Sequence, residues 1–135
     1  MRLAESYVDQ KSSRPSTAHA GHVIRGKPDW TTFADMREDW DGDLIVKGVL
    51  DVRAARRLVD MGADGIWVSN HGGRQFEPGP AAITVLPEMR AALPNVPLIY
   101  DSGVATGMDI LRALALGAEF VMLGRAWHYA VADQG

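Results

Sequence analysis

The chain contains no cysteine and shows no excess of positive charge. The missing cysteines exclude disulfide bonds and thiolate metal sites within these 135 residues, and they fit a reducing compartment. The 14 lysines and arginines are scattered, are outnumbered by 17 aspartates and glutamates, and leave a formal net charge of -3. We therefore expect no nucleic acid partner, because proteins that bind nucleic acids present a clustered basic surface.

Long apolar runs are also missing. None approaches the roughly 20 residues that span a bilayer, and no continuous apolar signal core follows the first basic residue. We therefore expect a soluble, cytoplasmic protein without a membrane span. With 135 residues, of which 47% are hydrophobic, the chain amounts to one packed domain at most, or to a piece of a larger one.

Residues 1–27 have almost no periodic apolar pattern and are interrupted by serine, proline and glycine. This composition predicts a flexible leader or long loop. His19 and His22 are spaced as in some metal sites, but no carboxylate or third ligand on a predicted rigid element accompanies them. We interpret both as solvated loop histidines and expect no metal site.

From Pro28 onward, short apolar runs alternate with amphipathic stretches. The predicted helices are 28–40 with a cap at Asp29 and Trp30 and Trp40 as core anchors, 51–61 with Asp51 near its start, 81–93 interrupted or offset by Pro87, 106–116 and 127–133. The predicted strands are 44–46, 66–68, 96–100 and 120–123. Strand and helix therefore alternate four times, which predicts a parallel sheet buried on both faces.

Two segments of the sequence resemble each other, which supports repeated βα units. Residues 61–69 and 116–124 share one chemical order, namely a helix end, Gly-Ala, an acid, an apolar strand and a small residue. Repeated βα units of this kind build either an open doubly wound sheet or a (β/α)8 barrel.

Polar residues follow each predicted strand at its carboxyl end. They are Lys47, then His71 and Arg74, then Asp101-Ser102-Gly103, then Gly124-Arg125. The strand starts carry only turn residues and acids. Parallel α/β folds build their sites at the carboxyl rim, and a barrel commonly holds a phosphate in its last two βα loops. Because three of the four ends offer a cation, we expect an anionic ligand with a phosphate at one end and a carboxylate at the other.

The run from Ile66 through Gln75 ends a strand in Ser-Asn-His-Gly-Gly-Arg-Gln. A lone histidine beside a glycine-rich turn is more often a surface or capping residue than a catalyst. Here Gly72 and Gly73 allow His71 and Arg74 to point into one cavity. An arginine binds a carboxylate with two parallel hydrogen bonds, and an imidazole moves a proton on the adjacent carbon or hydroxyl. The pair therefore favours a small acid as substrate.

These motifs resemble the C-terminal half of the FMN-dependent α-hydroxy acid oxidases and dehydrogenases, which include glycolate oxidase, lactate oxidase, L-lactate dehydrogenase and mandelate dehydrogenase. The segments that carry the resemblance are Ile45-Val46-Lys47-Gly48, residues 68–75, Asp101-Ser102-Gly103-Val104, residues 113–118 and Leu123-Gly124-Arg125. The resemblance runs from about Trp30 to the end of the chain. It implies an α/β fold that is the C-terminal half of a TIM (β/α)8 barrel, with four βα units, parallel strands and a partial domain at 28–135.

The resemblance also implies roles for individual residues. His71 would be the base when the α-carbon is oxidised, by carbanion formation or by hydride transfer, and it would contact the substrate. Arg74 would bind the substrate carboxylate. Lys47 would stabilise negative charge on reduced FMN and so act in catalysis as well as in cofactor binding. The positions implied to bind FMN are Lys47, Ser69, Asp101, Ser102, Gly103, Gly124 and Arg125.

Two features depart from the family pattern. The family often has a phosphate-binding arginine where this chain has Ala105, so Arg125 and backbone N–H groups near Thr106 would have to serve instead. The family's first four βα units, with their tyrosines and the aspartate that orients the catalytic histidine, have no counterpart here. Four strands do not close a barrel, which needs about 200 residues or more. Alone, they would leave two long sheet edges and the apolar inner face of the strands exposed.

We therefore expect a fragment or one half of an enzyme that oxidises a small 2-hydroxy acid, with a missing N-terminal half or a homo-oligomer as its partner. The alternative is a noncatalytic half-barrel that binds flavin phosphate weakly or only self-associates. A third option is another phosphate-binding barrel, of the isomerase or dehydrogenase type. Such a barrel would share the final Gly-Arg loop without needing His71 and Arg74 together.

Overall fold

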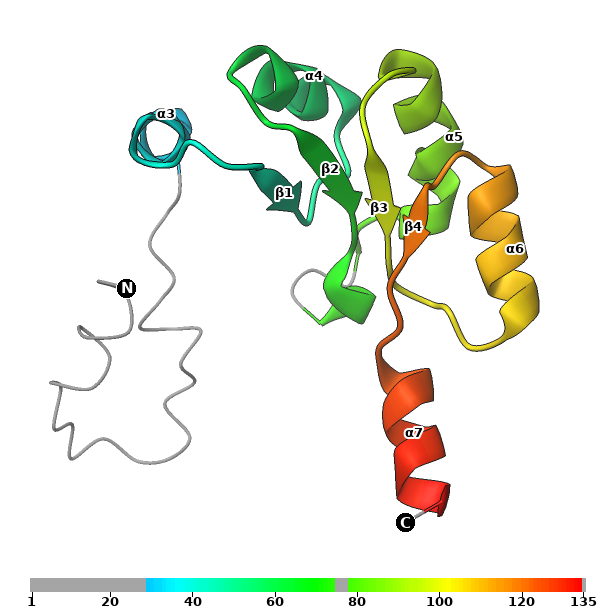
Figure 1. Cartoon of the computed structure of the whole chain (residues 1–135). Coiled ribbons are helices and arrows are strands. Elements are labelled where there is room, and N and C mark those ends of the chain that lie inside the picture. The colour runs from blue at the N-terminus through cyan, green and yellow to red at the C-terminus, as the bar shows by residue number, and fades with distance from the viewer. Residues whose placement is uncertain (1–28, 75–77, 135) are drawn as a thin grey trace, which may run out of the picture. The chain divides into compact units, whose positions relative to one another are not determined.

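A computed structural model describes residues 29–74 and 78–134. The chain divides into two compact units, Met1–Phe33 and Ala34–Gly135. The predicted leader at 1–27, with His19 and His22, lies outside the described residues. The second unit carries a four-stranded parallel sheet in the order β1-β2-β3-β4. In Figure 1 all four strands run toward the same end of the sheet.

The strands are short and the helices follow them as the sequence predicts. The strands are β1 (Ile45–Lys47), β2 (Gly65–Val68), β3 (Leu98–Tyr100) and β4 (Phe120–Val121). The helices are α3 (Trp30–Asp39), α4 (Val52–Asp60), the 3-10 turn η1 (His71–Gly73), α5 (Ala82–Ala92), α6 (Gly107–Ala115) and α7 (Arg125–Gln134). The prediction of four parallel βα units is confirmed. None of the helices in the described part of the chain is both long and apolar enough to cross a membrane.

Local capping explains where the helices begin. The Asp51 side chain accepts a hydrogen bond from the Ala54 N–H at the start of α4. At the start of α6, the Thr106 hydroxyl and the Asp109 carboxylate cap each other's backbone N–H groups. Such reciprocal caps satisfy N–H groups that the first helical turn leaves without partners. The predicted interruption of α5 is wrong, because the helix continues through Pro87.

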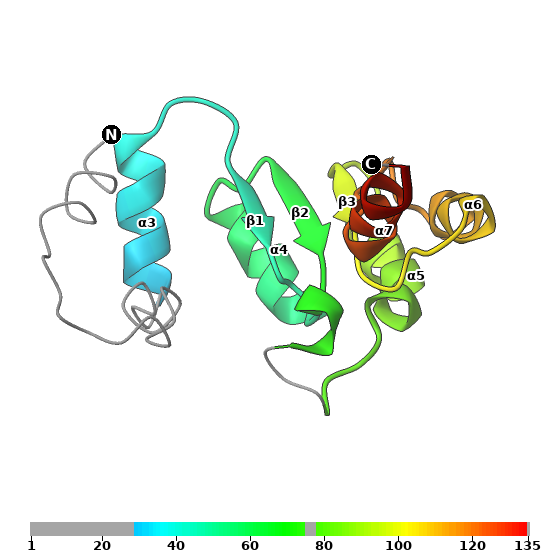
Figure 2. The same ribbon diagram turned by 90° about the horizontal axis from the view of Figure 1, so that it is seen from below.

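The core lies between the sheet and the helices on one of its faces. Figure 2 shows α4 and α5 on the same side of the strands. The side chains that point to this face alternate along β2 and β3, and Ile66, Val68, Leu98 and Tyr100 are all buried. Residues at i and i+2 of a strand share a face, so this alternation assigns the helix-covered side.

The opposite face of the sheet is much less covered. The strand pattern by itself predicted burial on both faces, whereas four strands that do not close a barrel were expected to leave this face exposed. Ile45 is 47% exposed and Phe120 62% exposed. Their neighbours Trp67 and Ile99 on the inner strands are half-buried. In a complete barrel this face would be filled by side chains from the opposite strands. Within the described residues no element covers it.

The prediction that Trp30 and Trp40 anchor the core is also wrong. No described residue of α3 is buried, and Trp40, just after the helix, is 56% exposed. The Trp40 indole N–H donates to the carbonyl of Asp43 instead. Helical spacing of apolar residues predicts that they share a face, but it does not reveal what covers that face.

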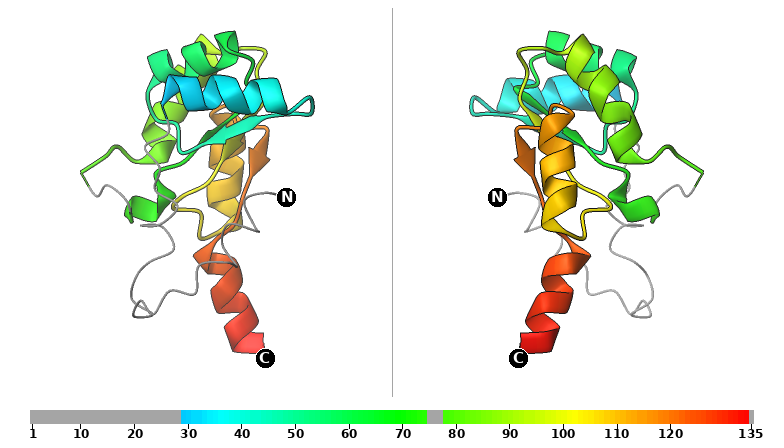
Figure 3. Two further views of the ribbon diagram at one scale, coloured as in Figure 1. Left: turned by 90° about the vertical axis from the view of Figure 1, so that its left-hand side faces the viewer. Right: turned by 90° about the vertical axis from the view of Figure 1, so that its right-hand side faces the viewer.

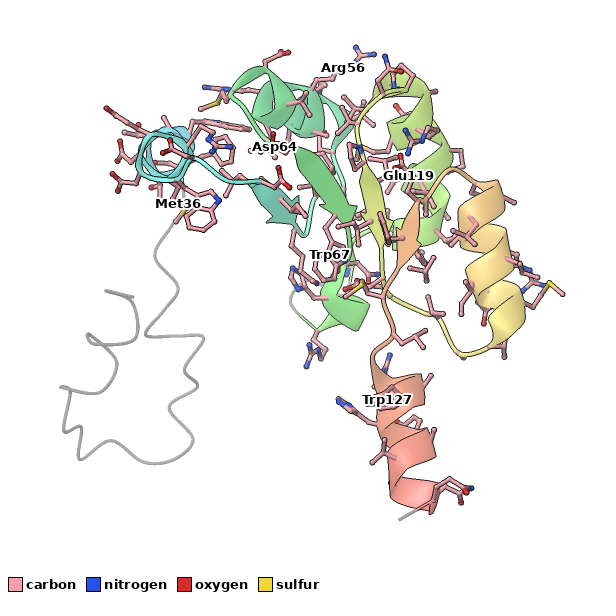
Figure 4. The ribbon with its side chains drawn as sticks, viewed as in Figure 1. Met36, Arg56, Asp64, Trp67, Glu119 and Trp127 are labelled. Atoms are coloured by element: carbon pink, nitrogen blue, oxygen red, sulfur yellow. The ribbon has the colours of Figure 1, made fainter. Side chains whose placement is uncertain are left out.

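The two similar sequence segments, 61–69 and 116–124, are each bound by an arginine side chain at the amino end of a strand. We call each set of these hydrogen bonds an arginine brace. Before β2, Arg37 donates to the carbonyl of Gly62 at 3.2 Å and to the carboxylate of Asp64 at 2.9 Å. Before β4, Arg90 donates to the carbonyl of Gly117 at 2.9 Å and to Glu119 at 2.8 Å. Figure 4 labels Asp64 and Glu119 at this end and Trp67 toward the other.

We expect Gly117→Ala to destabilise the fold by more than about 2 kcal/mol. Gly117 has a φ of +108°, and a Cβ there would lie 2.6 Å from Cγ of Arg90, so the substitution strains the backbone and displaces the brace. Urea denaturation measures the effect. Gly107→Ala is the matched control, because a Cβ there meets no atom within 4 Å and its midpoint should stay or rise slightly. Equal midpoints for the two variants would show that the brace tolerates a side chain.

Candidate functional site

The polar residues at the carboxyl ends of the strands meet in one pocket of about 200 Å³. Its lining residues are Lys47, His71, Gly72, Arg74, Asp101, Ser102, Gly103, Val104, Met122, Leu123, Gly124 and Arg125. Eight of the nine predicted site positions are in this set, and the ninth, Ser69, is fully buried and hydrogen-bonded to Lys47. The predicted gathering of these residues at one rim is therefore confirmed. Their individual roles stay predictions.

Lys47 is held at the end of β1 by three groups from the neighbouring strands and loops. Its ammonium lies 3.0 Å from Oδ2 of Asp101 and 3.0 Å from Oγ of Ser69. It also sits 4.8 Å from the centre of the Trp67 ring, which attracts a cation through its negative face. The pairing of Lys47 with Trp67 across β1 and β2 places both on the same side of the sheet. The cation therefore has a fixed position but still lines the pocket.

The surroundings of Asp101 favour its ionised form. Burial alone favours the neutral acid, but hydrogen bonds from Ser69, Ser102 and Lys47 outweigh burial and lower the pKa of Asp101 below its ordinary value. A carboxylate and an ammonium in contact, each partly open to the pocket, form a polar patch. Such a patch can both accept hydrogen bonds from hydroxyl groups and stabilise a negative charge.

The loop after β2 bends through three consecutive residues with positive φ. These are His71 at +55°, Gly72 at +67° and Gly73 at +77°. The Asn70 side chain stabilises the bend, because its Oδ1 accepts from the Gly72 N–H at 3.0 Å. The two glycines adopt this conformation without strain, whereas His71 does so at a cost of about 1–2 kcal/mol. Strained backbone of this kind concentrates at functional sites.

The surroundings of His71 favour the neutral form of its imidazole. Burial lowers the pKa of its imidazole, the positive charges of Lys47 and Arg74 lower it further, and the negative charge of Asp101 opposes them. A neutral imidazole next to a pocket is a proton acceptor. A base at this place in the pocket is what the sequence predicts for His71, and the lowered pKa is compatible with that role.

Two arginines complete the lining. The Nε of Arg74 donates to the carbonyl of His71 at 3.1 Å, which ties the guanidinium to the same turn as the imidazole. Arg125 begins α7, and its Nη2 would lie 3.6 Å from a Cβ on Gly72. Figure 3 shows α7 following β4 at the carboxyl end of the sheet. Within the described residues, no hydrogen bond or ion pair involves the guanidinium of Arg125.

Sequence reasoning missed Gly48. A Cβ at this position would lie only 2.7 Å from Nε2 of His71, and its φ of +89° already disfavours any other residue. Gly48 therefore makes room for the imidazole from the neighbouring strand end. The Lys-Gly pair after β1 is visible in the sequence, but its proximity to His71 depends on strand order and register. Trp67 beneath Lys47 was missed for the same reason.

Comparison with known proteins identifies the family. The model for the FMN-dependent dehydrogenase family matches residues 2–135. The chain belongs to this family. The resemblance inferred from the motifs is confirmed, together with FMN as the family's cofactor.

Relatives within the FMN-dependent dehydrogenase family include an FMN-dependent alpha-hydroxy acid dehydrogenase from Schizosaccharomyces pombe, with 40% identity over 95% of this chain and 32% of its own length. The L-lactate dehydrogenase of Vibrio cholerae is 46% identical over 78% of this chain and 28% of its own length. A mandelate oxidase structure with benzoyl-formic acid has a TM-score of 0.76 and 41% identity, over 80% of this chain and 32% of that chain. The chain thus spans about a third of the length of its relatives, and the sheet is part of a TIM barrel.

Proposed function

We propose that this chain supplies the base, the carboxylate clamp and part of the FMN site for the oxidation of a small (S)-2-hydroxy acid to the 2-oxo acid. The observation that carries the proposal is the convergence of Lys47, His71, Arg74 and Arg125 on one pocket at the carboxyl rim. The family and its lactate and mandelate relatives support the same reaction class. The complete activity requires the rest of the barrel, because this chain covers about a third of its relatives.

The substrate end of the pocket fits a hydroxy acid. Nε of Arg74 is engaged by His71, so its two Nη groups would bind the carboxylate with parallel hydrogen bonds. His71, on the same turn, would then face the adjacent α-carbon and its hydroxyl, and its neutral imidazole would accept a proton from one of them. The imidazole would take the hydrogen of the α-carbon as a proton in carbanion formation, or the hydroxyl proton when that hydrogen leaves as a hydride.

The other end of the pocket has the chemistry that FMN requires. Lys47 would lie beside the flavin ring and the Asp101 carboxylate would accept hydrogen bonds from the ribityl hydroxyls. Gly103 and Gly124 line the pocket, and a Cβ at either would meet no protein atom within 4 Å, so the space before their backbones is open. Arg125 and backbone N–H groups at the start of α7 would hold the phosphate. When bound, FMN accepts the two electrons that leave the substrate.

The size of the pocket agrees with a shared site. Its volume of about 200 Å³ falls below the ~300–1,000 Å³ of typical ligand sites, so these residues form one wall of a larger cavity. The alternative, a noncatalytic half-barrel that binds flavin phosphate weakly or self-associates, is favoured by the exposed apolar side chains on the helix-free face of the sheet.

A chimera tests the proposal. The part of this chain that matches the L-lactate dehydrogenase of V. cholerae over 107 residues replaces its counterpart in that enzyme, which supplies the rest of the barrel. We expect the purified chimera to be yellow and to lose its flavin absorbance under anaerobic conditions with (S)-lactate, (S)-mandelate or glycolate, but not with (R)-lactate. A yellow chimera that none of these acids bleaches would contradict the proposed activity. A soluble but colourless chimera would contradict the FMN site.

A further inference from the structure

Ser102 adopts a backbone conformation that suits glycine better than serine. Its φ is +87°, and it is one of two residues other than glycine with positive φ in the described part of the chain. The other is His71. L-residues avoid this region because their Cβ crowds the following carbonyl. Strained residues of this kind persist where contacts with the surrounding structure hold them, so contacts of the Ser102 side chain should explain its conformation.

The hydroxyl of Ser102 joins two loops that are distant in sequence. Its Oγ accepts from the N–H groups of Asn70 and Gly72, each at 3.3 Å, and donates to Oδ1 of Asp101 at 2.7 Å. Asn70 and Gly72 flank His71 on the loop after β2, whereas Asp101 directly follows β3. The loop that carries the imidazole is thereby tied to the residue that pairs with Lys47.

The backbone of Ser102 is fixed independently of its hydroxyl. The buried phenol of Tyr100 donates to the carbonyl of Ser102 at 2.5 Å. A glycine at 102 would keep this bond and would relax the positive φ, but it would provide no acceptor for the two N–H groups. Gly72 has a second acceptor in Oδ1 of Asn70, so the N–H of Asn70 depends most on the serine.

We propose that Ser102 is a positioning residue whose hydroxyl holds the His71 turn against Asp101, so that the base and the Lys47–Asp101 pair keep one relative geometry. As regards catalysis, this inference rests on the function proposed above. In this proposal the Ser102 side chain aligns the loop after β2 with the loop after β3. The Ser102 backbone remains able to contact the cofactor. The tie between the loops is a property of the chain itself and can be measured without flavin.

Two substitutions separate the hydroxyl from the backbone strain. Ser102→Gly removes the hydroxyl and relaxes φ, whereas Ser102→Ala removes the hydroxyl and keeps the strain. In the full chain, we expect both to speed amide hydrogen exchange at Asn70 by about tenfold, the equivalent of one hydrogen bond. Only Ser102→Ala should also lower the urea midpoint. Thr84→Ala is the control, because the Thr84 hydroxyl donates only within its own turn and lies outside the pocket.

The pKa of His71 distinguishes a positioning role of Ser102 from a purely structural one, because a purely structural role would leave that pKa unchanged. Followed by NMR in the full chain, the pKa of His71 should rise toward its ordinary value in Ser102→Gly, because a released turn exposes the imidazole to water. Lys47, Arg74 and Asp101, the charged groups that act on His71, remain in place. In the chimera, Ser102→Gly should lower kcat by about tenfold and change KM little.

Unchanged exchange at Asn70 and an unchanged His71 pKa in Ser102→Gly would overturn the positioning role, whatever the chimera does. Faster exchange with an unchanged kcat would also overturn it, because the tie would then be irrelevant to the reaction. If the chimera with native Ser102 oxidises no hydroxy acid, the proposed function fails, and exchange and pKa still decide whether the tie exists.

Discussion

His71→Gln is expected to lower the turnover of hydroxy acid by the flavin-loaded chimera by roughly 10²–10⁴-fold. Glutamine has nearly the same reach and can donate a hydrogen bond, but it does not accept a proton at neutral pH. Since Arg74 and the Lys47–Asp101 pair are untouched, KM and FMN content should change little. Steady-state kinetics with (S)-lactate, normalised to bound flavin, measure the effect.

The control for this substitution is His128→Gln, which alters an exposed histidine on α7 outside the pocket. It should leave turnover within about twofold of the parent, as surface substitutions usually do. Equal loss in both variants would indicate damage to α7 or to the fold rather than removal of a base. Full turnover in His71→Gln would show that another group accepts the proton.

The pH dependence of kcat/KM in the chimera should also be set by His71. Protonation of His71 removes the base, so kcat/KM should fall as pH drops through the pKa of the imidazole. Burial and the charges of Lys47 and Arg74 lower that pKa, so the acidic limb of the profile should lie below the ordinary histidine value of about 6.5. A limb above that value would contradict the neutral state assigned to His71.

The sequence predicted the repeated βα units well because both of their signals are local. Four apolar runs of strand length, each followed by an amphipathic stretch with a cap or terminal glycine, determine element type and direction without reference to the rest of the fold. The location of the candidate site was likewise predictable, since every strand end contributes its own polar residue and parallel strands bring their carboxyl ends together. The placement of Lys47, His71 and Arg125 around one pocket confirms that reasoning.

What escaped prediction depends on residues far apart in the chain. The apolar composition of the strands predicts burial on both faces of the sheet, and only the count of four strands indicates that the face of Phe120 stays exposed. The space that Gly48 leaves for His71, and the ring of Trp67 beneath Lys47, appear only when β1 is placed beside β2. Ser102 was predicted only as a cofactor contact, because its bonds to Asn70 and Gly72 appear only when β2 and β3 lie side by side.

Lys47→Met should lower turnover in the chimera by roughly 10²–10³-fold, the usual effect of removing a donor that faces developing negative charge. Methionine keeps most of the length and the apolar stem of the lysine, so the contact with Trp67 survives in part while the ammonium is lost. The flavin should also become harder to reduce, because a fixed cation near the ring favours its reduced, negative form. Redox titration of the chimera measures this independently of turnover.

The same substitution should move the acidic limb of the pH profile to higher pH. Lys47 lowers the pKa of His71, so its removal raises that pKa, and the negative charge of Asp101, no longer paired with an ammonium, raises it further. Arg53→Met is the control, because it removes one positive charge from α4 at a side chain that is 94% exposed and outside the pocket. A limb that shifts equally in both variants would mean that the net charge of the protein, rather than contact with Lys47, sets the ionisation of the base. A limb that shifts only in Lys47→Met would tie the base and the cation to one site.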